Sequence, residues 1–202
     1  MDSRMKILIL VCLLIFLIIL VMCAPKRPII LENVFSQPDV DFKTYQKVAV
    51  LEFIPNPDVK KDKKFNDLVE GEFREKGYYV VGMDEFNSVL EDFGFSSEDL
   101  TNPYVLKKIR ERLYVTAIIR DEVQQYEIKK KKDYTFFIWE GGASTVVTNI
   151  YICDISLIIE MIEVQEGNKV WSCSISCNQK KGKPDKLIRN MLRDSLNTIP
   201  QE

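Results

Sequence analysis

Along residues 47–113, short apolar runs typical of strands alternate with segments whose apolar residues recur at helical spacing. Short apolar runs rich in β-branched and aromatic residues, at 47–53 and 78–82, are each followed by a segment whose apolar residues recur at helical spacing. This order of segments predicts an α/β fold in which amphipathic helices pack on a mixed sheet. The run at 47–53 is stopped by Pro55 and is expected to form a buried, central strand.

Three amphipathic helices are predicted within the same region. The first covers 65–76 and ends at Gly77, because a basic last turn followed by glycine is a normal helix end. The second is expected to be capped by Asp84 and to end at Gly94. The third begins at Asn102-Pro103, a capping residue followed by proline at the first helical position.

The second half of the chain predicts a mainly antiparallel sheet. A strand over 113–128 should end at the lysines of 129–132, and a long β-rich stretch follows from 145 to 164. Residues 166–169 favour a tight hairpin turn into a strand over 170–177. Both alternations of the stretch before the turn are largely apolar, so we expect both of its faces to be covered. A last helix would cover one face with Leu187, Ile188, Met191, Leu192 and Leu196.

The N-terminal segment has the composition of an export signal. Arg4 and Lys6 precede an apolar run over 7–22, and a basic region before an apolar one is typical of a secretory signal peptide. The end of the run, Leu20-Val21-Met22-Cys23, resembles the lipobox of bacterial lipoproteins, in which the cysteine becomes the diacylated first residue. We therefore expect a lipid on Cys23. The alternative is an uncleaved helix that anchors the chain, with Cys23 as an ordinary residue.

Residues 24–46 are expected to form an extended tether, because prolines are spread among polar residues there. The short run Ile29-Ile30-Leu31 leaves an edge strand as the alternative. The predicted organisation is a signal peptide or membrane anchor over 1–22, a lipid-anchored tether over 23–46 and a single α/β domain over 47–202.

Composition and motifs exclude several classes of function. The net charge is −2 with both signs evenly mixed, whereas nucleic-acid-binding domains carry a basic excess. The chain has no histidine, the commonest metal ligand and general base. No Gly-rich phosphate loop, nucleophile elbow or metal-ligand spacing occurs in the sequence. The carboxylates expected to be caps or solvated charges rather than catalytic acids are Asp84, Glu85, Asp121 and Glu122.

We therefore expect no cofactor, no metal, no nucleic acid and no enzymatic activity. An enzyme of unrecognised type would need a concave pocket with perturbed acids. Cys173 and Cys177 lie four residues apart on a predicted strand, so their Cα atoms should be about 13 Å apart, beyond the roughly 7 Å limit for a disulfide. Together with Cys153 they are expected to be buried thiols that act as small apolar residues.

The order of elements from residue 47 to 177 is distinctive. It consists of Val48–Phe53, a helix, Tyr79–Val81 leading into Val89-Leu90 and Gly94-Phe95, Leu113–Ile119, and Leu157–Val164 turning at Gly167 into Val170-Trp171-Ser172. This ordered set resembles the curli-secretion (CsgG-like) lipoprotein superfamily, which includes lipoprotein activators of peptidoglycan synthases, with TolB amino-terminal-like periplasmic domains as fold relatives. The resemblance implies helices packed on a mixed sheet. Arg120-Asp121 departs from it, since many relatives carry a glycine there.

The resemblance also raises a channel role, because the curli channel member inserts β-hairpins into the outer membrane. The corresponding stretch here is 134–147. A membrane strand needs roughly 9–11 residues that alternate between lipid and lumen, and adjacent aromatic residues do not alternate. We therefore expect a surface contact loop, with a partner-contact site made of Phe136, Phe137, Ile138 and Trp139.

The expected function is that of a membrane-tethered envelope lipoprotein, facing the periplasm, that binds another envelope protein and assists assembly or regulation of a periplasmic machine. Its membrane contact would be the N-terminal lipid or helix. The alternatives are a subunit of an outer-membrane secretion channel and a bitopic protein anchored by an uncleaved N-terminal helix. In each case further copies of the chain are a possible partner, in a homo-oligomer.

Overall fold

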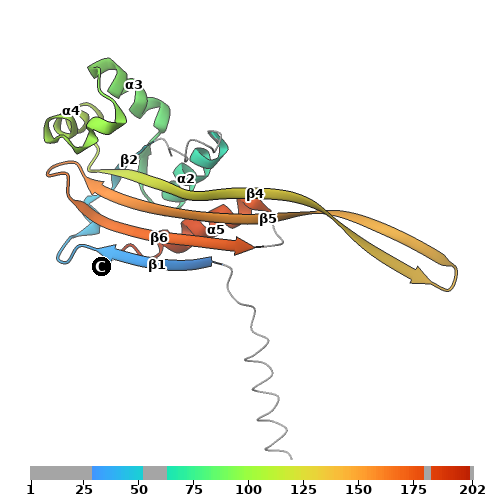
Figure 1. Ribbon diagram of the computed structural model, residues 1–202. Helices are drawn as coiled ribbons and strands as arrows, with labels where there is room; N and C mark the ends of the chain where they lie inside the picture. Colours follow the sequence, from blue (N-terminus) through green and yellow to red (C-terminus); the bar gives the residue numbers. More distant parts are fainter. Residues whose placement is uncertain (1–28, 52–62, 180–182, 201–202) are drawn as a thin grey trace, which may run out of the picture.

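The computed structural model describes residues 29–51, 63–179 and 183–200. They form a six-stranded mixed sheet in the order β1-β6-β5-β4-β2-β3, with helices on both faces (Figure 1). The predicted fold class is confirmed. The strands are β1 (Ile29–Ser36), β2 (Lys47–Val50), β3 (Tyr79–Val81), β4 (Ala117–Trp139), β5 (Gly142–Glu163) and β6 (Lys169–Gln179). The helices are α2 (Lys63–Glu75), α3 (Met83–Phe93), α4 (Pro103–Leu113) and α5 (Pro184–Leu196), with 3-10 turns η1 (Phe42–Thr44) and η2 (Ser97–Thr101).

Strand β2 lies inside the sheet, because it pairs in parallel with both β3 and β4. Val48, Ala49 and Val50 are completely buried, as expected of a short apolar run with both faces covered. The strand is one position from the β3 edge rather than in the middle of the sheet. The pairs β1–β6, β6–β5 and β5–β4 are antiparallel, which confirms the predicted antiparallel second half.

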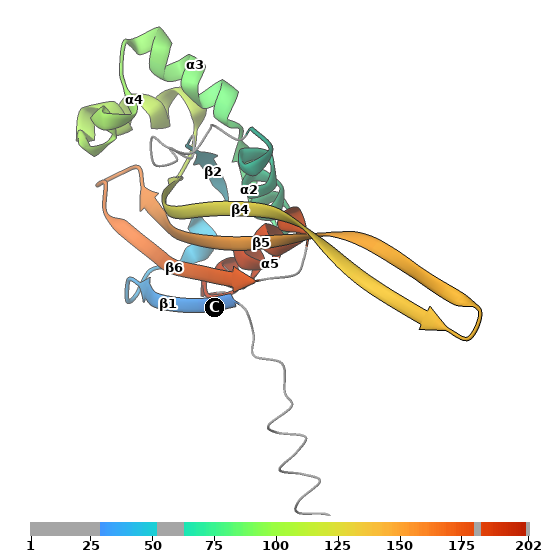
Figure 2. The same ribbon diagram turned by 45° about the vertical axis from the view of Figure 1, so that its right-hand side comes forward.

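Two hydrophobic cores lie on opposite faces of the sheet (Figure 2). Helices α2 and α5 cover the first face, where Phe73, Trp171 and Met191 are completely buried. Helices α3 and α4 cover the second face over β2, β3 and the beginning of β4, around Phe86 and Leu106. The second core therefore protects only one end of the sheet.

The second face of β5 is not fully covered, contrary to expectation. Residues on that alternation, among them Ile158 and Ile162, are half-buried rather than buried. The neighbouring strand β6 presents Ser174 and Ser176 on the same face, opposite Ile158 and Ser156. Because these side chains are small and polar, exposing this face costs less than the apolar pattern of β5 alone suggested.

Residues 29–46 belong to the folded domain. Strand β1 pairs antiparallel with β6 along its length, and Phe42 and Tyr45 are buried in the first core. The tether predicted over 23–46 is therefore wrong from Ile29 onward, and the edge-strand alternative is correct. The signal was weak because a strand at the edge of a sheet buries little side-chain area, and the side chains of β1 are mostly exposed.

The helix limits agree with the sequence except at the start of α3. Asn102 caps α4 as predicted. The N-cap of α3 is Gly82, and Asp84 lies in the first turn instead. The backbone N–H of Met83 donates to the Glu70 carboxylate of α2 at 2.9 Å. The hydrogen-bond acceptor thus comes from another helix, which local sequence cannot indicate.

Strand β4 departs furthest from the prediction. Helix α4 runs to Leu113, so the strand begins at Ala117 rather than at residue 113. It does not end at Ile128 but continues through the four lysines to Trp139. This extension, together with the matching part of β5, forms the candidate site.

Candidate functional site: the projecting hairpin

Strands β4 and β5 continue beyond the rest of the sheet as a two-stranded ribbon (Figures 1 and 2). The pairing of β5 with β6 ends at Cys153. We call the ribbon from Lys129 to Ile152 the projecting hairpin; its turn is Glu140-Gly141. With about ten residues in each strand and roughly 3.3 Å per residue, it extends about 33 Å from the sheet.

Both faces of the hairpin are apolar near the tip. Directly opposed residues of an antiparallel pair point to the same side, so the register assigns each side chain to a face. Phe136 and Ile138 are 71% and 85% exposed, and Phe137 and Trp139 are 52% and 56% exposed. The face that continues the first core carries Tyr134, Phe136, Ile138 and Val147, and the other carries Phe137, Trp139 and Val146.

The base of the hairpin is cationic. The four lysines of 129–132 are all exposed, and the alternation of the strand places two of them on each face. Lys129 forms an ion pair with Glu127 on its own strand. The projecting hairpin therefore has an apolar tip and a basic base, and each of these features is present on both faces.

The four residues predicted as a partner contact, Phe136–Trp139, all lie at the exposed tip, but the loop conformation predicted for them is wrong. Lysines and adjacent aromatic residues break the alternation that identifies a half-buried strand. A ribbon that is solvated on both sides has no buried face to impose this alternation. Backbone pairing with β5 keeps the segment in the strand conformation instead. Whether the tip contacts a partner stays a prediction.

The cysteines of the domain are buried free thiols, as predicted. Burial raises the pKa of Cys173 and of Cys177 to about 11, so both stay protonated at neutral pH and are poor nucleophiles. Among the described residues, no group of three or more Cys, Asp or Glu side chains could hold a metal ion.

Asp121 differs from the solvated charge that the sequence suggested. It shares the alternation of Ile119 and Val123, which faces the first core, and burial raises its pKa to about 9. Neither oxygen of its carboxyl group accepts a hydrogen bond from a described residue. The other three carboxylates considered, Asp84, Glu85 and Glu122, are exposed.

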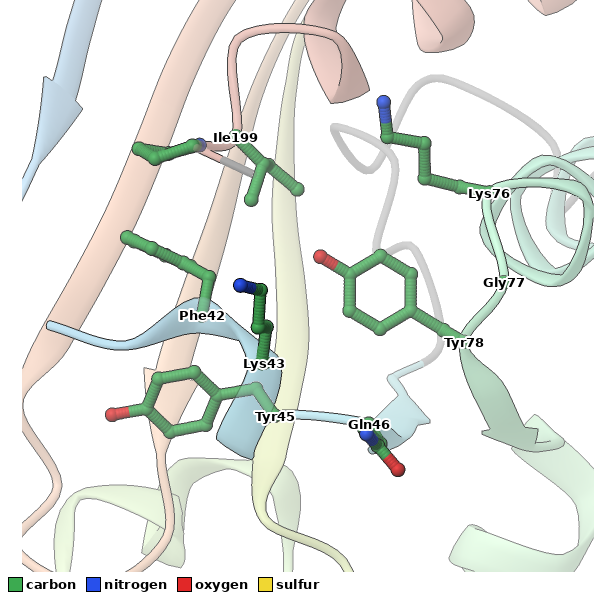
Figure 3. Close-up of a pocket in the computed structure, with 9 residues that line it drawn as sticks. Phe42, Lys43, Tyr45, Gln46, Lys76, Gly77, Tyr78 and Ile199 are labelled. Atoms are coloured by element: carbon green, nitrogen blue, oxygen red, sulfur yellow. The ribbon is translucent and has the colours of Figure 1, made fainter. Parts of the chain in front are cut away.

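Sequence reasoning did not indicate the pocket of about 360 Å³ near the start of β2 and β3 (Figure 3). The lining residues with polar side chains are Lys43, Tyr45, Gln46, Lys76 and Tyr78. They come from separate parts of the chain without a recognisable spacing, so no motif could have indicated the pocket.

The predicted lipidation site, Cys23, and the apolar run over 7–22 lie outside the described residues. Within the part of the chain that the structure covers, no helix combines the length and apolar character needed to cross a membrane.

No protein-family model matches the sequence, and no curated protein matches it. Solved structures do match. The PelC dodecamer from Paraburkholderia phytofirmans aligns with a TM-score of 0.54 at 12% identity, over 86% of this chain and 99% of the other. A variant of this PelC aligns with a TM-score of 0.50 at 9% identity, over 84% and 95%. Lipoprotein GNA1162 from Neisseria meningitidis aligns with a TM-score of 0.49 at 16% identity, over 76% and 96%.

The alignment with PelC spans almost the whole of that chain. At 12% identity the likeness concerns the fold alone. The chain therefore shares its mixed α/β architecture with PelC, a bacterial protein.

Proposed function

We propose that this protein is a membrane-tethered bacterial envelope lipoprotein of the curli-secretion type, without catalytic activity, that binds another envelope protein through the tip of the projecting hairpin. The observation that carries the proposal is the position of Phe136–Trp139, which are exposed on both faces far from either core. Exposed aromatic side chains of this kind are costly in water unless a partner covers them. Aromatic residues are also those that contribute most at protein interfaces.

The proposed anchor and the projecting hairpin can act at the same time, because the hairpin is longer than the segment between Cys23 and the domain. Strand β1 begins at Ile29, six residues after Cys23. Six residues reach at most about 20 Å, so a lipid on Cys23 would keep the β1 edge of the sheet near the bilayer. The projecting hairpin is longer than this reach. Its tip could therefore engage a partner some distance along or away from the membrane while the domain stays anchored.

A ring or channel subunit is the second candidate, and the hairpin itself favours it. The matching PelC structure is a dodecamer, and the projecting hairpin offers strand edges that neighbouring copies could pair with. The distribution of side chains argues for the first candidate. A membrane strand keeps one apolar face over roughly 9–11 residues, whereas here a short tip is apolar on both faces above four lysines.

Site-specific photo-cross-linking in cells tests the proposal. A photoreactive side chain at Phe137 should yield a discrete adduct with a different envelope protein, and one at exposed Lys107 on α4 should not. In co-purification, Phe137→Ser combined with Trp139→Ser should release this partner, whereas Ser144→Ala, opposite Phe137 on the same face, should retain it. An adduct only with further copies of the chain, together with rings in detergent, would favour the second candidate.

A further inference from the structure

The pocket drawn in Figure 3 and the projecting hairpin lie at opposite ends of the sheet, as the strand directions show. Gln46 and Tyr78 directly precede the parallel strands β2 and β3, so the pocket is at the amino ends of these strands. The hairpin instead extends from the carboxyl end of β4, which runs parallel to β2. The lining comes from Phe42, Lys43, Tyr45 and Gln46, from Lys76, Gly77 and Tyr78, and from Ile199 and Pro200.

Two hydrogen-bond donors are aimed into this pocket. Figure 3 shows the Lys43 ammonium group and the Tyr78 hydroxyl group pointing into the same space, between Phe42 and Ile199. Neither group has a hydrogen-bond or ionic partner among the described residues. The ring of Tyr78 is held by an edge contact with Phe73, with 5.6 Å between the ring centroids. The hydroxyl group is therefore held in place by its ring, and its hydrogen-bonding capacity is open to the pocket.

The charged side chains that line the pocket, Lys43 and Lys76, are both cationic. At its rim the Lys76 ammonium group donates to the Asn197 side chain at 3.1 Å, and none of the described lining residues is acidic. The nearby carboxylate of Asp41 already accepts the backbone N–H of Lys43 at 3.0 Å. The hydroxyl group of Tyr45 donates to Glu163 at 3.3 Å and in Figure 3 points away from the other donors.

We propose that this pocket binds an oxyanion, a carboxylate or phosphate group, carried on a small organic body such as a sugar ring. Lys43 and Lys76 would supply the charge, and the Tyr78 hydroxyl group would donate a hydrogen bond to the anion. Phe42 and Ile199 would contact the apolar face of the body. A volume of about 360 Å³ lies within the range of small-molecule pockets.

The protonation of Tyr78 is consistent with this role. Burial raises the pKa of its hydroxyl group to about 12, so the group remains a donor at every physiological pH. An ionised tyrosine would repel an anion.

The test is calorimetric titration of the full chain in detergent micelles with glucose 6-phosphate, glucuronate, neutral glucose and inorganic phosphate. Both anionic sugars should bind saturably, and glucose about tenfold more weakly or not at all. Lys43→Gln should weaken binding of the anionic sugars about fivefold and Tyr78→Phe about threefold. Lys108→Gln, on the surface of α4, is the matched control and should leave binding unchanged.

Three results would overturn the inference. These are the lack of saturable binding at tens of millimolar, equal affinity for glucose and its phosphate, and a Lys43→Gln variant that binds as well as the Lys108→Gln control. If inorganic phosphate bound as tightly as the sugar phosphate, the pocket would recognise the anion alone, and the part of the proposal that concerns the organic body would be wrong. Lys43 is exposed, so its substitution should not unfold the domain. The pocket is independent of the hairpin, and the Phe137→Ser, Trp139→Ser variant should bind the sugars normally.

Discussion

Arg193 on α5 donates to the Glu72 carboxylate on α2 at 3.1 Å, which connects the two helices that cover the first face of the sheet. The Glu72 side chain is only 4% exposed, whereas that of Arg193 is 54% exposed. Arg193→Ala would leave a buried carboxylate without its cation. We expect a loss of about 1–3 kcal/mol in the free energy of unfolding, measured by urea denaturation.

Glu75 provides the control for this prediction. It also accepts from Arg193, at 2.8 Å, but its side chain is 58% exposed. Glu75→Ala should therefore cost less than about 0.5 kcal/mol. Equal effects of the Arg193 and Glu75 substitutions would mean that burial of Glu72 does not matter.

Glu70 should stabilise α3 although it belongs to α2. Its carboxylate accepts the Met83 backbone N–H, and Glu70→Ala would leave this N–H without its acceptor. We expect a loss of about 1 kcal/mol, seen as a lower melting temperature. Glu70→Gln keeps an acceptor oxygen and should lose much less. Glu91→Ala, on the exposed side of α3, should have little effect.

Asp121 should make the domain less stable as the pH rises. Its folded-state pKa, about 9, lies above the value of roughly 4 expected in the unfolded chain. Its contribution is therefore fully present below pH 4 and is lost progressively up to about pH 9. Asp121→Asn should raise the free energy of unfolding at pH 8 by about 1–3 kcal/mol and leave it unchanged at pH 4. An equal increase in the free energy of unfolding at both pH values would mean that packing, and not the charge of Asp121, causes the effect.

The thiols of Cys153, Cys173 and Cys177 should resist alkylation in the native protein, because they are buried. All three should react after unfolding without any reductant. Mass spectrometry of the alkylated chain measures both states. A disulfide between Cys153 and Cys177 would contradict the register, in which Cys177 lies opposite Ile155.

Elements whose apolar residues face a core could be predicted from the sequence. The stripes of α2, α3, α4 and α5, and the short run of β2, are each imposed by burial, and all of them are found. The elements that were missed bury little. β1 lies at the edge of the sheet with exposed side chains, and the outer half of the β4–β5 pair is exposed on both faces.

The site was predicted only in part for the same reason. Phe136–Trp139 stood out because four adjacent large apolar residues cannot all point into one core. Their place at the end of a long ribbon depends on the pairing of β4 with β5 across many residues, which local pattern does not encode. The acceptor that Glu70 offers to Met83 and the donors that meet in the pocket of Figure 3 likewise depend on contacts between distant segments.

The edge position of β1 also has a mechanical consequence. β1 is the first strand after the N-terminal segment, and its hydrogen bonds to β6 begin at the pair Ile29↔Cys177. A load that pulls this segment away from the sheet would act on one pair at a time, because an edge strand is held on one side only. Since the side chains of β1 bury little surface, the strand would peel at low force while both cores stay intact.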